Sequence, residues 1–246
     1  GATATISGSP GGASFANTKS VSFDGVDDYA TFTPGPIAAT ADYTFSFWLN
    51  VDSFSALGFA VFDLLGNALT LNTTGNVVWE TRFYSNFAFG IKTVITSASE
   101  DAWNHLVIVK QAYVPSGSTT FTYYVNGSSV GTYVRSPVAA TYAFGNSSGG
   151  NGLMYLSRYT SGGYFVNALI DEMAIFTSAL DATAVSGIYN GGTPDDLSSL
   201  SPRNWYRMGD GASSVDGTSD SATTVYDMGA SKGSTTDITL VNAVYS

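Results

Sequence analysis

One stretch of this chain, Ala168–Tyr189, constrains the fold more than any other. Its sequence, ALIDEMAIFTSALDATAVSGIY, starts as an apolar run suited to a buried strand and continues directly into a short helix. Almost every other segment has the pattern of strand and turn. A β-rich chain with one late helix and no alternation of strands with helices predicts an all-β fold.

The strand signals are short and closely spaced. Thr44–Val51 alternates apolar and polar residues with the period of two of a half-buried strand. Asn126–Gly127 separates two β-type runs and predicts a tight hairpin. Turn signals recur about every 8–12 residues, which is typical of a two-sheet antiparallel sandwich or jelly roll. The single helix is expected near 181–190, with Asp181 as its N-cap and Asn190 at its end.

Three regions are expected along the 246 residues. Residues 1–19 are small and polar, and they predict a flexible N-terminal arm or an anchor onto a partner. Residues 20–192 carry the jelly-roll sandwich. Residues 193–246 form a C-terminal segment that is expected to fold back and add strands to the same sandwich.

Composition excludes several classes of protein. The chain has nine Lys and Arg residues and a net charge of −10, so no basic stripe for nucleic acid is available. It has no cysteine, which excludes disulfides and thiolate metal sites. No apolar run reaches membrane-spanning length, and the first residues lack the pattern of a signal peptide. We expect a binding or structural module outside a cell or on a virion surface.

Five motifs in order carry a family resemblance. They resemble the laminin-G-like, concanavalin-A-like lectin/glucanase jelly roll over about residues 20–192. Ala184 stands where that family usually has a Glu that completes a capping box. The motifs are VSFDGVDDYATF (Val21–Phe32), YTFSFWLNV (Tyr43–Val51), WNHLVIVK (Trp103–Lys110), YYVNGSSVG (Tyr123–Gly131) and ALIDEMAIFTSALDATAVSGIYNGG (Ala168–Gly192).

The tail departs from the family order. NWYRMGDG (Asn204–Gly211) and the run Val225–Ala243 resemble a segment that usually precedes the FDG strand, yet here they come last. We expect the tail to pair beside the N-terminal strands of its own domain. Pairing with a neighbouring subunit, or a separate appendage, are the alternatives. Similar tails are typical of marine phage proteins, which implies a virion protein.

Glucanases of this superfamily use paired glutamates on one strand, which flank the scissile bond. This chain has only three glutamates, Glu80, Glu100 and Glu172, and no two lie close in sequence. Asp171 and Glu172 are adjacent on a predicted strand, so their side chains are expected on opposite faces. The single histidine, His105, is expected to be structural. The sequence therefore predicts no enzyme.

Binding sites are predicted from a few residues. A cluster beside two glycine-rich loops offers aromatic rings and planar polar groups for a saccharide: Tyr155, Arg158, Tyr159, Tyr164 and Asn167. Calcium is the possible cofactor, with Asp24, Asp27 and Asp171 as its ligands. The alternative is that these aspartates only shape turns and loops.

The leading hypothesis is a non-enzymatic surface adhesion or structural module, such as a phage capsid decoration or fibre protein. It would contact other virion or surface proteins, or further copies of itself, and would meet host surface glycans weakly. The alternative is a lectin with a defined saccharide site, either with or without calcium dependence. A glycoside hydrolase is the remote alternative.

Overall fold

The computed structural model describes most of the chain outside several loops. Side chains are not described for β4 to β7 or for residue 135. The predicted loop 145–152 lies outside the described residues. No helix in the described part is long and apolar enough to cross a membrane. The described residues are 15–35, 37, 41–52, 59–64, 67–71, 77–81, 90–95, 101–111, 118–135, 154–158, 165–212, 217–233 and 235–246.

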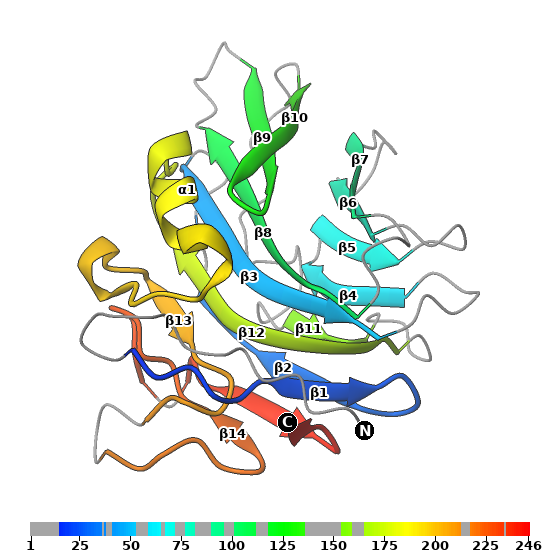
Figure 1. Ribbon diagram of the computed structural model, residues 1–246, viewed down its shortest axis with the longest axis vertical. Helices are drawn as coiled ribbons and strands as arrows, with labels where there is room; N and C mark the ends of the chain where they lie inside the picture. The colour runs from blue at the N-terminus through cyan, green and yellow to red at the C-terminus, as the bar shows by residue number, and fades with distance from the viewer. Residues whose placement is uncertain are drawn as a thin grey trace.

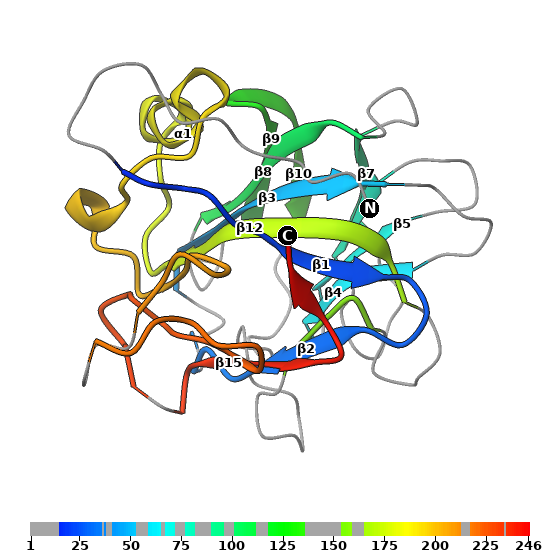
Figure 2. The same ribbon diagram turned by 60° about the horizontal axis from the view of Figure 1, so that its bottom comes forward.

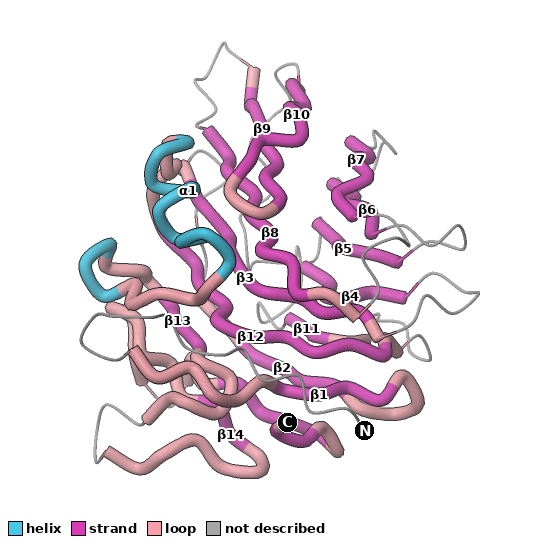
Figure 3. Tube along the Cα trace, viewed as in Figure 1, coloured by secondary structure: helices cyan, strands magenta, loops and turns pink. Residues whose placement is uncertain are grey.

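Two antiparallel sheets pack face to face, as predicted for a jelly-roll sandwich (Figure 1). We call them sheet A and sheet B. Figure 2 separates the layers, with β12 and β3 of sheet A above β2 and β15 of sheet B. Strands dominate the described chain, and the one α-helix, α1 (Ala182–Tyr189), lies at one side (Figure 3).

Sheet A has the order β10-β9-β8-β3-β12-β1-β16, with β13 also paired to β12. Its strands are β1 (Val21–Asp24), β3 (Tyr43–Val51), β8 (Trp103–Gln111), β9 (Thr119–Val125), β10 (Ser128–Arg135), β12 (Asn167–Phe176), β13 (Asn204–Tyr206) and β16 (Val244–Tyr245).

Sheet B has the order β14-β15-β2-β11-β4-β5-β6-β7. Strand β7 (Gly90–Ile95) was not predicted from the sequence. The strands are β2 (Tyr29–Phe32), β4 (Phe59–Leu64), β5 (Asn67–Leu71), β6 (Val77–Thr81), β7 (Gly90–Ile95), β11 (Met154–Leu156), β14 (Thr224–Val225) and β15 (Ile238–Val241).

Alternation along β3 explains the layering. Phe45, Phe47 and Leu49 point into the core between the sheets. Trp48 points to the other face and is still only 3% exposed. It is buried because α1 and the C-terminal segment cover the outer face of sheet A, where a second apolar cluster includes Val185. Sheet A is therefore covered on both faces, like the middle layer of a three-layer stack.

Local signals fix two connections. Asn126 and Gly127 both have positive φ, 51° and 74°, which is the conformation of a type I′ hairpin turn. The helix begins where predicted, because the Asp181 side chain accepts a hydrogen bond from the Ala184 backbone N–H at 2.8 Å. It ends at Asn190, which is in the left-handed region at φ 47° and ψ 44°.

The C-terminal segment contributes strands to both sheets. β13 pairs with β12, β15 pairs with β2, and β16 pairs with β1. Ser20 and Ser246 exchange two backbone hydrogen bonds, so the chain ends beside the start of β1. Ser20 and Ser246 therefore lie side by side, next to the edge strand β16 of sheet A.

We expect Asp181→Ala to lower the free energy of unfolding by about 1 kcal/mol, because the N-cap oxygen is lost. Urea unfolding followed by circular dichroism measures this. Ser186→Ala, at an exposed position of the same helix, is the control and should leave stability unchanged or slightly raised. An unchanged midpoint for Asp181→Ala would mean that the helix end does not limit stability.

Candidate functional site

A bulge in β12 turns two neighbouring carboxylates to one face of sheet A. The expectation that Asp171 and Glu172 lie on opposite faces is wrong, because the register against β3 shifts between Asp171 and Ala174. Glu172 has a φ of 44°, in the left-handed region where bulges usually have glycine. Ile170 and Met173 both stay in the core between the sheets. Both carboxylates therefore point to the outer face of sheet A.

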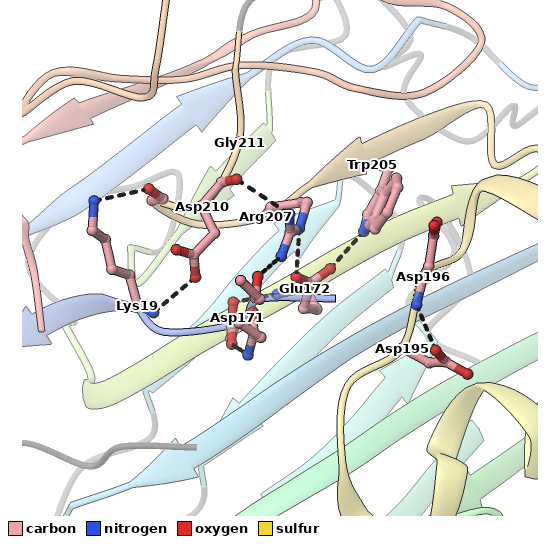
Figure 4. Close-up of polar contacts among 12 residues, drawn as sticks. Lys19, Asp171, Glu172, Asp195, Asp196, Trp205, Arg207, Asp210 and Gly211 are labelled. Carbon is pink, nitrogen blue, oxygen red and sulfur yellow. Dashed lines mark hydrogen bonds and ion pairs between the residues drawn. The ribbon is translucent and has the colours of Figure 1, made fainter. Parts of the chain in front are cut away.

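Both carboxylate oxygens of Glu172 are paired (Figure 4). Oε1 lies 3.0 Å from Nε of Arg207, and Oε2 accepts a 2.6 Å hydrogen bond from Nε1 of Trp205. The Glu172 side chain is 2% exposed. Burial raises the pKa of its carboxyl, and the Arg207 guanidinium acts in the opposite direction. This ion pair fastens the start of the C-terminal segment to β12.

Asp171 is held by the N-terminal side of the chain. Its Oδ2 accepts a 2.8 Å hydrogen bond from Nδ2 of Asn17, and its Oδ1 accepts one from the backbone N–H of Glu172. The side chain is fully buried. Burial, and then the neighbouring Glu172, raise the pKa of the Asp171 carboxyl well above its usual value. Asp171 therefore acts as a buried acceptor, and the predicted role as a calcium ligand beside Asp24 has no geometric support here.

Residues 15–19 are packed onto the body of the protein, in contrast to the flexible arm that the sequence predicts over 1–19. Asp210 accepts hydrogen bonds from the backbone N–H groups of Thr18 and Lys19, at 2.6 and 2.8 Å, and from the Thr18 hydroxyl. The ring of Phe15 stacks on Trp205 at 5.9 Å, and Arg207 lies 4.0 Å from the Phe15 ring centre. Residues 1–14 lie outside the described residues.

The motif NWYRMGDG serves packing along its length. Asn204 donates to the carboxylate of Asp227 at 2.7 Å, and the Tyr206 hydroxyl donates to a backbone carbonyl. Gly209 has a φ of 119°, and a Cβ there would lie 2.9 Å from the Cβ of Lys19. Only glycine leaves room for the N-terminal segment at this point. The motif therefore packs residues 15–19 and the rest of the C-terminal segment against each other.

A small pocket lies beside Glu172 on the outer face of sheet A. His105 lines it, with Nε2 2.8 Å from the Ser46 hydroxyl. Burial lowers the pKa of the imidazole to about 3, so the ring is neutral at pH 7. Its Nδ1 has no hydrogen-bond partner in the described chain, so no carboxylate orients the ring as in a catalytic triad. His105 instead packs against the rings of Trp48 and Tyr189, which also stack on each other.

The turn between β1 and β2 brings Asp24, Asp27 and Asp28 together, with one carboxylate oxygen of each within 4.8 Å of the others. This spacing fits oxygen ligands around one calcium ion. Three oxygens are about half of the 6 to 8 that calcium takes. Each carboxylate also has a role within the protein, because Asp24 accepts from Val26, Asp28 from Asp24, and Asp27 from Asn242. The turn can therefore contribute part of a calcium shell.

Two of the predicted saccharide-binding residues meet on the outer face of sheet B. Tyr155 and Arg158 lie beside Tyr29, which was not among the residues predicted to bind a saccharide. The Arg158 guanidinium carbon lies 4.7 Å from the Tyr29 ring centre and 5.5 Å from that of Tyr155. The two tyrosine rings are 6.4 Å apart. We call Tyr29, Tyr155 and Arg158 the aromatic–arginine platform.

The platform faces outward because its strands alternate. Ala30 and Phe32 on β2 are buried in the core, as are Met154 and Leu156 on β11, whereas the tyrosines between them are half-buried. Tyr159 and Tyr164 lie outside the described residues. Asn167 is not part of the platform: it starts β12 in sheet A and donates a 2.6 Å hydrogen bond to Asp52.

Comparison with known families agrees with this architecture. A family model described as the concanavalin A-like lectin/glucanases superfamily matches residues 24–186. The chain belongs to this superfamily. No curated protein sequence matches the chain. The expected fold is thereby confirmed for this concanavalin A-like domain, and the tail that follows residue 186 lies beyond the family match.

Solved structures with this fold are distant in sequence. A proposed carbohydrate binding protein from Bacteroides ovatus is 17% identical, with a TM-score of 0.60 over 93% of this chain and 59% of the other. The botulinum neurotoxin serotype D ligand binding domain, solved with N-acetylneuraminic acid, is 12% identical, with a TM-score of 0.52 over 86% and 53%. The chain thus spans little more than half of the length of either of these proteins, and the likeness shows the fold.

We expect Glu172→Gln to destabilise the domain by about 3 kcal/mol, because it leaves the buried Arg207 guanidinium without its counter-charge. Thermal and urea unfolding measure the loss. Asp195→Asn removes an exposed carboxylate nearby and should change stability by less than about 0.5 kcal/mol. Equal effects of the two substitutions would contradict the structural role of the ion pair.

Asp171→Asn should reduce the pH dependence of stability. In the folded state the pKa of Asp171 is raised above the ordinary value of 3.8, so the folded protein takes up a proton at a higher pH than the unfolded chain. This proton stabilises the fold at low pH, and the contribution is lost as the pH rises through the folded pKa. Urea unfolding between pH 4.5 and 7.5 should show Asp171→Asn gaining stability over the unsubstituted protein as pH rises. A constant difference across this range would contradict the shift.

Proposed function

We propose that this domain is a carbohydrate-binding module that acts by contact and carries out no hydrolysis. The aromatic–arginine platform on sheet B carries this proposal. Its two tyrosine rings lie on adjacent strands, with their centroids 6.4 Å apart. This separation is similar to the width of one or two sugar rings. Sugar rings present flat C–H faces that pack against aromatic side chains, and their hydroxyl groups need planar polar partners.

Threonine hydroxyls extend the same surface. Thr31 is the register partner of Tyr155 on β11 and of Thr239 on β15, so cross-strand neighbours share the outer face. Thr239 is exposed and Thr31 is half-buried. A row of hydroxyl groups beside aromatic rings offers both donors and acceptors, which saccharide hydroxyls require.

The adjacent carboxylates that could serve a hydrolase, Asp171 and Glu172, already have structural hydrogen-bond partners. A retaining glycosidase places two carboxyl groups about 5–5.5 Å apart on either side of the scissile bond. Asp171 and Glu172 are only 0% and 3% exposed, and their oxygens already accept hydrogen bonds. A sugar would have to displace the two chain ends to reach them.

The relatives support binding rather than cleavage. One structural neighbour is named as a proposed carbohydrate binding protein and another was solved with a bound sugar. Adhesion at a virion or cell surface, with other surface proteins or further copies of the chain as partners, remains a prediction. The composition of the particle or sample that contains the chain would test it.

A calcium-dependent saccharide site is the second candidate, favoured by the carboxylates of Asp24, Asp27 and Asp28. Asp28 directly precedes Tyr29 of the platform. A cation at this turn would neutralise three like charges and could accept sugar hydroxyls. A glycan array with calcium and the same array with a chelator separate the two candidates: equal binding in both supports the platform alone.

We expect Tyr155→Ala to abolish most glycan binding on such an array, because the stacking surface is lost. Tyr155→Phe keeps the ring and should retain binding, and thermal unfolding checks that both variants are folded. Hydrolysis of any bound polysaccharide, lost in Glu172→Gln, would contradict the proposal. So would silence of the unsubstituted protein with calcium and with chelator.

A further inference from the structure

Arg158 has hydrogen-bonding groups for which the described residues offer no acceptor. Guanidinium carries five N–H donors. In the described chain Arg158 donates no side-chain hydrogen bond and forms no ion pair, and its Nε is buried without a partner. Other described cations differ: Lys110 donates to the carbonyl of Ala41, and Arg207 is paired with Glu172. Buried polar groups in proteins are almost always satisfied, so the unpartnered Nε needs an explanation, and a ligand that binds beside the two tyrosine rings would supply one.

The position of Arg158 is fixed on both sides. Ser157, which precedes it, has a φ of 60°, and its hydroxyl both donates to and accepts from the backbone of Val166. Arg158 itself forms a backbone bridge with Phe165. The side chain then lies across Tyr29 and Tyr155. The two rings hold the guanidinium in place before any ligand binds, which lowers the ordering cost of binding.

We propose that the platform recognises acidic glycans, with Arg158 receiving a sugar carboxylate; this rests on the proposed function. A planar guanidinium donates two parallel hydrogen bonds to a carboxylate, and the paired geometry suits a carboxylate carried on a sugar ring. The two tyrosines then contact the apolar face of the same ring or its neighbour. The ligand class is therefore a polysaccharide or glycan that contains uronic or sialic acid.

The overall charge of the chain does not prevent this. The net charge of −10 repels anions at long range, but salt screens charges beyond about 8 Å at physiological ionic strength. Binding should therefore be weak in very low salt, strongest at moderate ionic strength, and set by the local contact rather than by long-range attraction.

The test compares four polymers in the presence of chelator, by isothermal titration calorimetry. Polygalacturonate carries a carboxylate on every sugar, and its carboxyl-reduced product lacks them. Dextran is neutral, and dextran sulfate carries the other common anion. We expect polygalacturonate to bind at least tenfold more tightly than its reduced product. Binding by dextran sulfate alone would overturn the carboxylate assignment.

Variants assign the effect to the guanidinium. Arg158→Gln should weaken polygalacturonate binding about tenfold or more and remove most of the preference for polygalacturonate over the reduced polymer. Arg158→Lys keeps the charge but not the planar fork, and it should resemble Arg158→Gln. Lys232→Gln removes an exposed positive charge elsewhere and is the matched control. Thermal unfolding confirms that each variant is folded.

The outcomes separate the inference from the proposed function. Equal binding of the acidic and reduced polymers, lost in Tyr155→Ala, overturns the inference and leaves a neutral-glycan module. Unchanged polygalacturonate binding by Arg158→Gln also overturns it. No binding of any polymer by the unsubstituted protein contradicts the proposed function itself.

Discussion

The packing of the N-terminal and C-terminal segments onto β12 depends on the bulge at Asp171–Glu172. β1 pairs with the first half of one edge of β12, and β13 pairs with the second half. The bulge lies between these partners, where the ladder of that edge is interrupted. It turns two carboxylates outward, one toward Asn17 and one toward Arg207 (Figure 4). A regular strand would present only one of them.

The same use of carboxylates recurs throughout the C-terminal segment. Asp220 accepts from the backbone N–H groups of Gly209, Gly211 and Tyr226, and Asp227 accepts from those of Trp205 and Gly229. An ionised acceptor makes stronger hydrogen bonds than a neutral one. Much of the acidity of this chain therefore organises loops that contain little regular structure. This accounts for a low pI without invoking a cationic partner.

Local patterns in the sequence predicted what depends on neighbouring residues alone. The alternation in Thr44–Val51, the Asn126–Gly127 turn and the Asp181 cap each correspond to an observed element. The bulge could not be predicted in this way, because it is a shift in register against β3 and lies where the partner on the other edge of β12 changes from β1 to β13, and all three strands are distant in sequence. The role of Tyr29 was missed for a similar reason: β2 and β11 are far apart in sequence and adjacent only in sheet B.

The central claim is that the outer face of sheet B meets the glycan, while the bulge network on sheet A is structural. The most direct test follows the backbone amide chemical shifts by NMR while the isotope-labelled protein is titrated with an oligosaccharide that it binds. The account predicts shift changes at Tyr29, Thr31, Tyr155 and Arg158, with the signals of Glu172 and Arg207 unmoved. Changes centred on Glu172, Trp205 and Arg207 would contradict it.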